Sequence, residues 1–229
     1  MISGDMSQRV VVDTQTMMWQ ASNSGTVSRK RAHLVGGAES GQVTSVVRYS
    51  PNATFPVHDH PDGEEIFVLQ GTFSDEQGDW PAGTYLLNPE GFRHAPFSRE
   101  GCVLFVKLWQ YGGPERLHLV LHRDDRDWQV TAHTGIRTKI LYEDPALPYQ
   151  TQLEQWDAGT ALGTLEYSGD IEIFVLSGSF EDEYGVCGEH TWLRIPAGRK
   201  HIPTSSQGCA LYVKTGRLPG LRSTPVTET

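Results

Sequence analysis

The feature that most constrains the fold of this chain is an internal repeat. Residues 65–80, EIFVLQGTFSDEQGDW, recur at 172–187 as EIFVLSGSFEDEYGVC, so Glu65 maps onto Glu172 with an offset of 107 residues. The same offset holds without gaps beyond this segment, and roughly half of the positions from 63 to 107 match their partners. Self-similarity of this length indicates a duplicated structural unit. The chain therefore contains two copies of one fold.

A turn-rich segment marks the expected boundary between the two copies. The 229 residues are enough for two domains of the usual size. The run YGGP at 111–114 is a Gly/Pro break of the kind that separates domains. We therefore expect an N-terminal domain over residues 1–116 and a C-terminal domain over residues 117–229.

Each copy is expected to consist of strands. Short runs rich in Val, Leu, Phe and Tyr occupy residues 44–50, 65–70, 84–88 and 102–109. Turn residues separate them, and helical periodicity is almost absent. The 24 glycines and 13 prolines fit such a turn-rich chain. Regularly spaced short strands predict an all-β antiparallel sandwich or barrel.

Composition excludes several classes of partner. The net charge of -9 opposes binding to phosphate backbones and to anionic lipid surfaces, so we expect no nucleic acid and no membrane partner. No stretch approaches the ~20 apolar residues of a membrane span. The start, MISGDMSQRVVVD, lacks the apolar region of a secretory signal. Three cysteines without a CxxC pair are typical of a reducing compartment, and we expect a cytoplasmic protein.

A candidate metal site lies in the first copy, in the segment PVHDHPDGEE. Side chains two apart on a strand point to the same side, so His58 and His60 should share one face. A Pro-Asp-Gly turn follows, after which Glu64 begins the next strand and can return its carboxylate to the same interior. His94, in the run GFRHAP, can reach this interior from a neighbouring strand. Three imidazoles and a carboxylate can chelate one divalent metal ion per chain.

This spacing resembles the cupin superfamily, whose first motif is HxH, three or four residues, Glu, six residues, Gly. The matching residues are His58, His60, Glu64 and Gly71. The second cupin motif is matched loosely by Gly83, Pro89 and His94. The resemblance implies two tandem cupin (RmlC-like jelly-roll) β-barrels. A lone HxH pair would also fit solvated loop histidines, whereas the full spacing favours a metal site.

A closer resemblance is to the cupin domain of ChrR-type proteins, and it covers His58 to Cys102 without gaps. It rests on the pattern HxHPxGEExxVLxGxFxDExGxxPxGxYxxNPxGxxHxPxSxxGC. In that family the two histidines, the first glutamate and the later histidine bind zinc. The resemblance therefore implies zinc on His58, His60, Glu64 and His94. By donor chemistry, Fe, Mn and Ni remain alternatives.

Glu65 is the alternative carboxylate to Glu64. Adjacent residues on a strand face opposite ways, so only one of the two can join the site. Glu64 shares parity with the expected inward residues Ile66 and Val68, and it stands seven positions before Gly71. We therefore assign the ligand role to Glu64.

The second copy has lost most of this site. The offset places Leu165, Tyr167 and Ile171 where the first copy has His58, His60 and Glu64. The remaining ligand position holds His201, and one histidine binds a divalent ion weakly.

We therefore expect His201 to be structural. Apolar side chains should fill the interior of the C-terminal unit.

Two further residue types recur at equivalent positions. Lys107 and Lys214 are expected to face solvent, and the alternative is a lysine inside a barrel that pairs with a carboxylate or with substrate. Cys102 and Cys209 each begin an apolar strand and are expected to be buried. Cys187 falls in a predicted hairpin turn, where we expect greater exposure than for the other two thiols.

Two functions fit this sequence. One is a metal-dependent cupin dioxygenase that acts on a small organic substrate. The other, implied by the ChrR resemblance, is a sensory or regulatory protein that binds a small molecule. In ChrR-type proteins the anti-sigma activity belongs to an N-terminal module with His/Cys zinc ligands, whereas residues 1–40 contain no cysteine. We therefore do not expect direct binding to a sigma factor. The sequence leaves a homodimer open.

Overall fold

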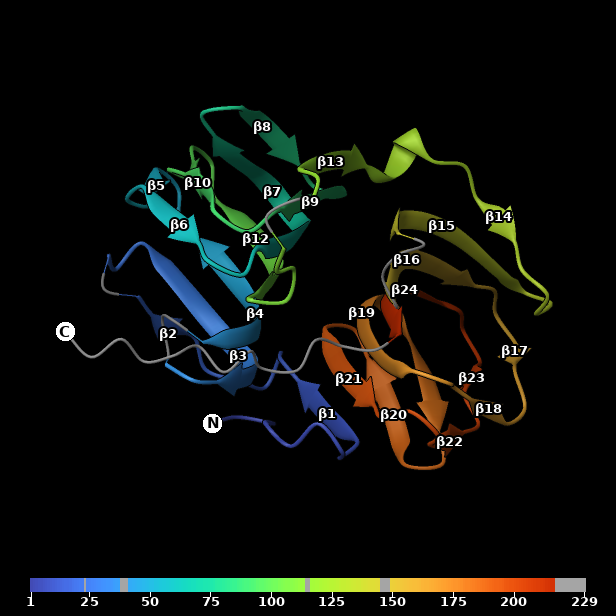
Figure 1. The fold of residues 1–229 in the computed structure, drawn as a ribbon. Coiled ribbons are helices and arrows are strands. Elements are labelled where there is room, and N and C mark those ends of the chain that lie inside the picture. The colour runs from blue at the N-terminus through green and yellow to red at the C-terminus, as the bar shows by residue number, and fades with distance from the viewer. Residues whose placement is uncertain (23, 38–40, 114–115, 145–148, 217–229) are drawn as a thin grey trace.

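The chain forms two all-β units side by side in the computed structural model (Figure 1). The structure describes residues 1–22, 24–37, 41–113, 116–144 and 149–216. Within these ranges the one helical element is the short 3₁₀ turn η1 (Arg123–Asp125). No helix in the described part of the chain is long and apolar enough to cross a membrane. The expected all-β fold is confirmed.

The N-terminal unit is built on a ten-stranded sheet with the central order β13-β9-β7-β12-β4-β3-β2. The strands of this sheet are β2 (Gln20–Ala21), β3 (Val27–Val35), β4 (Gln42–Tyr49), β5 (Ala53–Thr54), β7 (Glu64–Asp75), β8 (Gly78–Pro81), β9 (Thr84–Asn88), β11 (Phe97–Ser98), β12 (Cys102–Leu108) and β13 (Leu119–His122). A separate antiparallel pair consists of β6 (His58–His60) and β10 (Phe92–His94). The strands expected from the sequence are all present.

The C-terminal unit repeats this arrangement, with the central order β1-β21-β19-β24-β16-β15-β14. The strands of this second sheet are β1 (Val10–Asp13), β14 (Gln129–Val130), β15 (Ile136–Glu143), β16 (Tyr149–Trp156), β17 (Thr160–Ala161), β19 (Asp170–Asp182), β20 (Gly185–Gly188), β21 (Thr191–Ile195), β23 (Thr204–Ser205) and β24 (Cys209–Gly216). The separate pair is β18 (Leu165–Glu166) with β22 (Lys200–His201). Each unit is a jelly roll of two sheets.

The two units exchange their first strands. Strand β1 pairs with β21 of the C-terminal sheet, from Val10 opposite Arg194 onward. Strand β13 pairs with β9 of the N-terminal sheet, from Leu119 opposite Leu87 onward. Strands β9 and β21 are equivalent in the repeat, so the exchange is reciprocal. The division at residues 116 and 117 remains a prediction, and Pro114 of the expected connector lies outside the described residues. Strand pairing crosses this division in both directions.

Strand alternation gives each sheet one face toward its own interior and one face toward the other unit. On β7, Ile66 and Val68 belong to the core inside the N-terminal jelly roll. Phe67, between them, belongs to a cluster shared by both units. Glu65 faces the same way as Phe67 and is 1% exposed. The two glutamates at 64 and 65 therefore lie on opposite faces of the sheet.

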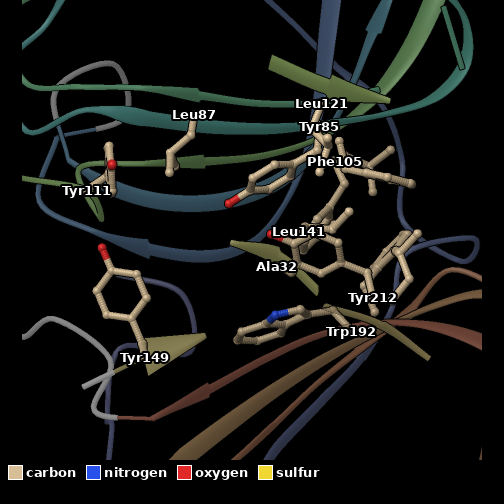
Figure 2. Close-up of a cluster of buried hydrophobic side chains, with 14 residues drawn as sticks. Ala32, Tyr85, Leu87, Phe105, Tyr111, Leu121, Leu141, Tyr149, Trp192 and Tyr212 are labelled. Carbon is tan, nitrogen blue, oxygen red and sulfur yellow. The ribbon is translucent and has the colours of Figure 1, made fainter. Parts of the chain in front are cut away.

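The shared cluster is rich in aromatic side chains (Figure 2). Phe105 and Phe174, one from each unit, stack with ring centroids 4.4 Å apart. Tyr85 and Trp192, at equivalent positions of the repeat, are fully buried in the same cluster. Burial of large aromatic side chains is a strong stabilising contribution. The two jelly rolls therefore share a hydrophobic core rather than meeting at a hydrated interface.

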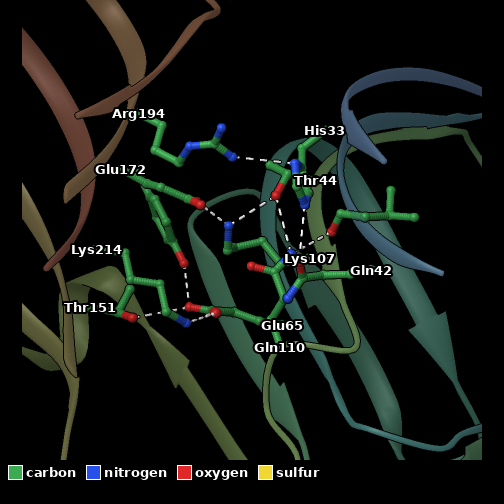
Figure 3. Close-up of polar contacts among 12 residues, drawn as sticks. His33, Gln42, Thr44, Glu65, Lys107, Gln110, Thr151, Glu172, Arg194 and Lys214 are labelled. Carbon is green, nitrogen blue, oxygen red and sulfur yellow. Dashed lines mark hydrogen bonds and ion pairs between the residues drawn. The ribbon is translucent and has the colours of Figure 1, made fainter. Parts of the chain in front are cut away.

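The repeated lysines lie in this interface, so the expectation that they face solvent is wrong. Lys107 is 1% exposed and Lys214 is fully buried. Lys107 forms an ion pair with Glu172, and Lys214 forms one with Glu65 (Figure 3). Each pair joins the two units, and the repeat relates one pair to the other. The alternative interpretation, a buried lysine paired with a carboxylate, is confirmed, although the site lies between the jelly rolls.

The two glutamates of these pairs have different surroundings. Glu65 also accepts hydrogen bonds from the hydroxyl groups of Tyr85, Thr151 and Tyr212. Burial alone would raise the pKa of Glu65, but the ammonium groups of Lys214 and Lys107 lower it to about 2. The carboxylate of Glu172 hydrogen-bonds only to Lys107 among the described residues. Both carboxylates are therefore held in the charged form.

All three thiols are buried, which corrects the expectation for Cys187. Cys102 and Cys209 are buried as expected. Cys187 is 1% exposed because it lies on β20, opposite Phe180, and points into the C-terminal core. The hairpin turn lies at residues 183–184, before Cys187. Burial raises the pKa of each thiol to about 11.

Candidate metal centre

The candidate ligands converge from three strands of the N-terminal jelly roll, namely β6 (His58 and His60), the start of β7 (Glu64) and β10 (His94). In the β6–β10 pair, His94 lies directly opposite His58, and Phe92 lies opposite His60. Asp59, between the two histidines, is exposed, whereas His60 and His94 are 4% and 1% exposed. The alternation expected for the HxH segment is therefore present, and both imidazoles turn to the same side.

The ring nitrogens are spaced as the ligands of one ion would be. His58, His60 and His94 each offer a nitrogen within 4.8 Å of the other two. The Nε2 atoms of His60 and His94 lie 3.0 Å apart. Two nitrogens bound to one ion at about 2.1 Å would lie about 3.0 Å apart in neighbouring octahedral positions and about 3.4 Å apart in tetrahedral ones. The three imidazoles therefore fit a single divalent metal ion.

Glu64 borders this cluster. Its Oε2 atom is 3.3 Å from Nε2 of His60 and 3.6 Å from Nε2 of His94. The same oxygen accepts a hydrogen bond of 2.9 Å from the side-chain amide of Asn88. Asn88 pairs with Glu64 in the strand register, so the amide holds the carboxylate toward the histidines.

Hydrogen bonds to the outer ring nitrogens orient two of the imidazoles. Nδ1 of His58 lies 2.9 Å from the carbonyl oxygen of Pro56. Nδ1 of His94 lies 3.4 Å from Oδ2 of Asp75. In both rings this places the Nδ1 proton on the outer side and leaves Nε2 toward the cluster. Carboxylates and carbonyls in this position fix the tautomer of metal-binding histidines.

The surroundings of His60 and Glu64 favour the deprotonated forms of these two side chains. Burial lowers the pKa of His60, which keeps this imidazole neutral. Burial would raise the pKa of Glu64, but His60 and His94 lower it below its usual range. The pKa of His94 is raised in spite of burial, chiefly by its hydrogen bond to Asp75. A neutral imidazole and a charged carboxylate are the forms that bind a metal ion.

Sequence reasoning missed Asp75 and Asn88, although the repeat contained a signal for each. Asp75 recurs as Asp182, just as its partner His94 recurs at the equivalent position. Asn88 becomes Ile195, and its partner Glu64 becomes Ile171. Each pair is therefore kept or replaced together, as expected for side chains in contact.

A cavity of about 380 Å³ opens beside the histidines. Its walls are the inward faces of β3, β4, β7 and β12. Most of the lining is apolar, including Val47, Ile66, Phe73, Leu104 and Val106. A mostly apolar cavity with a few polar groups is the usual form of a site for a small organic molecule.

The equivalent region of the C-terminal unit has a different character. Leu165 lies opposite His201 on β18 and β22, as His58 lies opposite His94. Nε2 of His201 lies 3.2 Å from the hydroxyl of Tyr167. Ile171 belongs to the buried core. Among the described residues, the three-histidine cluster of the N-terminal unit is the one group suited to a metal ion.

Two jelly rolls in tandem, one with a cluster of histidines on its inner surface, define a bicupin. The chain belongs to the family of the ChrR Cupin-like domain, whose sequence model matches residues 7–112 and 117–219. This match confirms the resemblance found in the sequence. No curated protein matches the chain.

Solved structures with this fold include several enzymes. A provisionally assigned dioxygenase from Nostoc punctiforme has a TM-score of 0.76 at 17% identity, over 97% of this chain and 87% of the other. Salicylate 1,2-dioxygenase from Pseudoaminobacter salicylatoxidans has a TM-score of 0.69 at 12% identity, over 93% and 83%. Oxalate decarboxylase from Lactobacillus farciminis has a TM-score of 0.66 at 10% identity, over 92% and 86%. At these identities the likeness shows the fold alone.

Proposed function

We propose that this chain binds one divalent metal ion in its N-terminal jelly roll and that the ion faces a cavity for a small organic molecule. The observation that carries the proposal is the convergence of three imidazoles beside a cavity of about 380 Å³. The C-terminal jelly roll, with apolar residues at the equivalent ligand positions, would stabilise the first unit through the shared core.

The proposed ligands are His58, His60, Glu64 and His94. Zinc is the ion implied by the family, and Fe, Mn and Ni suit the same donors. When bound, an ion in octahedral geometry would supply a Lewis-acid or redox centre with two positions for exogenous ligands.

The surrounding residues would hold the site in place and keep it dry. Asp75 fixes the ring of His94, and Asn88 fixes the carboxylate of Glu64. The apolar walls, where Leu108 lies directly opposite Glu64 and Val106 lies opposite Ile66, would exclude water from an organic ligand. These contacts are suited to binding a small molecule in one orientation at the ion.

A second candidate function is that of a dioxygenase. It is supported by the accessible cavity beside the cluster and by the fold shared with proteins described as dioxygenases. The alternative is a cytoplasmic sensory protein that binds its small molecule without turnover. Both functions use the same metal ion and the same cavity.

Metal analysis of the purified protein tests the proposal. We expect one divalent ion per chain by mass spectrometry of the elements, and loss of that ion in His58→Ala. The matched control is His201→Ala, which alters the equivalent histidine of the other jelly roll and should retain the ion. Two ions per chain, or an unchanged metal content in His58→Ala, would contradict the proposal.

Nitric oxide separates the two candidate functions. If the protein is an oxygenase, the Fe(II)-loaded form should bind nitric oxide and give a paramagnetic signal that the zinc form lacks. If the purified protein contains zinc, and its Fe(II)-loaded form does not bind nitric oxide, the protein would be a binding or sensory cupin.

A further inference from the structure

Two arginines line the inner wall of the N-terminal jelly roll. Strand β3 alternates so that Arg29 and Arg31 face the cavity beside the candidate metal centre. In the register with β4, Arg29 lies opposite Val47 and Arg31 lies opposite Ser45, and both partners line the same cavity. The side chains of Arg29 and Arg31 therefore lie on the cavity face of the sheet and not on its outer face.

Both arginines are held in place by neighbours. Arg31 is 8% exposed, and its Nη1 atom donates a hydrogen bond of 3.0 Å to Oε1 of Gln20. The guanidinium carbon of Arg29 lies 5.7 Å from the centre of the Phe55 ring. An arginine that is fixed in this way loses little side-chain entropy when it binds a ligand.

A continuous row of side chains connects the arginine wall with the metal side of the cavity. In the strand register, Arg31 lies opposite Ser45, Ser45 opposite Val106, and Val106 opposite Ile66. On β7, Ile66 is two residues from Glu64 and faces the same way. The cavity thus has a cationic end on β3, an apolar middle, and a cluster of metal-binding residues at the other end.

Tyr49 adds a neutral donor to the cationic end. It lies on β4 opposite Val27, lines the cavity and is 8% exposed. Burial raises the pKa of Tyr49, so its hydroxyl keeps the proton at neutral pH. A hydroxyl and two guanidinium groups are the donors that a carboxylate accepts from in buried sites.

We propose that the small molecule of this cavity is a carboxylic acid with an apolar body, whose carboxylate is bound by Arg29 and Arg31. The planar guanidinium group matches a carboxylate with two parallel hydrogen bonds, and the apolar walls match the hydrocarbon body. This inference rests on the proposed function for the metal-facing end of the ligand. The contact between arginine and carboxylate does not require the ion.

Binding of charged and neutral isosteres tests the inference. Hexanoate and benzoate are the charged probes, hexanamide and benzamide are the neutral ones, and calorimetry is carried out on metal-loaded and metal-free protein. We expect each acid to bind at least about tenfold more tightly than its amide, since hydrogen bonds to a charged carboxylate are stronger than those to a neutral amide. We expect Arg31→Gln and Arg29→Gln to remove most of this preference.

The matched control is Arg48→Gln, which removes the same charge from the outward face of β4. Arg48 is exposed and lies beside Trp19, so its loss should leave the preference for acids unchanged. Arg29→Lys serves as a second variant, because it keeps the charge and loses the planar fork, and we expect an intermediate preference. Metal content, measured on every variant, should stay at that of the wild type.

The outcomes separate this inference from the proposed function. An arginine-dependent preference for acids in the metal-free protein supports the inference even if the protein holds no ion. A metal-loaded protein that binds acids and amides equally, or binds neither acid, overturns the inference and leaves the metal site intact. If Arg48→Gln and Arg31→Gln reduce the preference for acids over amides equally, the inference is also overturned, since the preference would then depend on the net charge of the protein and not on the cavity arginines.

Discussion

The two ion pairs between the jelly rolls should differ in their contribution to stability, although the repeat makes them equivalent. We expect Lys107→Met to destabilise the protein more than Lys214→Met. Each substitution removes a buried ammonium and leaves its glutamate in the interface. In Lys107→Met, the carboxylate of Glu172 loses its one hydrogen-bond partner among the described residues. In Lys214→Met, Glu65 keeps three hydroxyl donors.

The magnitudes follow from these surroundings. Removing one partner of a buried ion pair costs about 3–5 kcal/mol, and this range applies to Lys107→Met. Losing one hydrogen bond to a charged group costs about 1.5–3 kcal/mol, and this range applies to Lys214→Met. The expected difference in the free energy of unfolding is therefore about 2 kcal/mol. For a chain of this size it corresponds to a difference in Tm on the order of 4–8 °C.

Urea unfolding at neutral pH, followed by fluorescence and by circular dichroism, gives the free energies. The control is Lys200→Met, which removes a lysine from an exposed pair with Glu166 at 3.4 Å. We expect this control to lie within about 0.5 kcal/mol of the wild type. Equal destabilisation by Lys107→Met and Lys214→Met, or the reverse order, would refute the argument from hydroxyl donors.

Three further predictions concern the metal site, the thiols and acid stability. Asp75→Asn should weaken metal affinity about 10–100-fold in a chelator competition, whereas Asp182→Asn, the equivalent change in the other jelly roll, should leave it unchanged. The three thiols, whose pKa burial raises to about 11, should react with a colorimetric disulfide reagent only after unfolding; rapid labelling of the native protein at about pH 8 would contradict their burial. Burial alone would raise the pKa of Glu172, but Lys107 lowers it. This carboxylate therefore stabilises the fold above the ordinary glutamate pKa of about 4.3, and its contribution is lost as the pH falls through the folded value. Urea unfolding should accordingly show a smaller acid-induced loss of stability in Glu172→Gln than in the wild type.

The sequence was sufficient for features that depend on local periodicity. The repeat offset predicted two copies, and the apolar runs predicted the strands that β4, β7, β9 and β12 form. Alternation placed Glu64 and Glu65 on opposite faces, as the structure has them. The spacing of His58, His60 and His94 predicted a cluster of imidazoles, because neighbouring strands of a jelly roll bring such positions together.

Other features depend on which surface each strand face meets, and this is decided by residues that are distant in the chain, such as Glu172 for Lys107. Lys107 alternates with inward residues, so its sequence context is that of a surface side chain. Only the packing of the second jelly roll against this face makes the lysine a buried partner of Glu172. The same packing brings β1 and β13 across to the opposite units.

The sequence by itself thus determined the duplication, the strands and the set of candidate metal ligands, since each can be recognised from the spacing of residues along the chain. The tertiary structure decided that the two copies share one aromatic core, that Asp75 orients His94, and that Arg29 and Arg31 face the cavity. The physical reason is that alternation assigns side chains to two faces of a strand but does not determine what packs against either face. Only the curvature of each sheet and its contacts with the other unit assign one face to the cavity and the other to the interface.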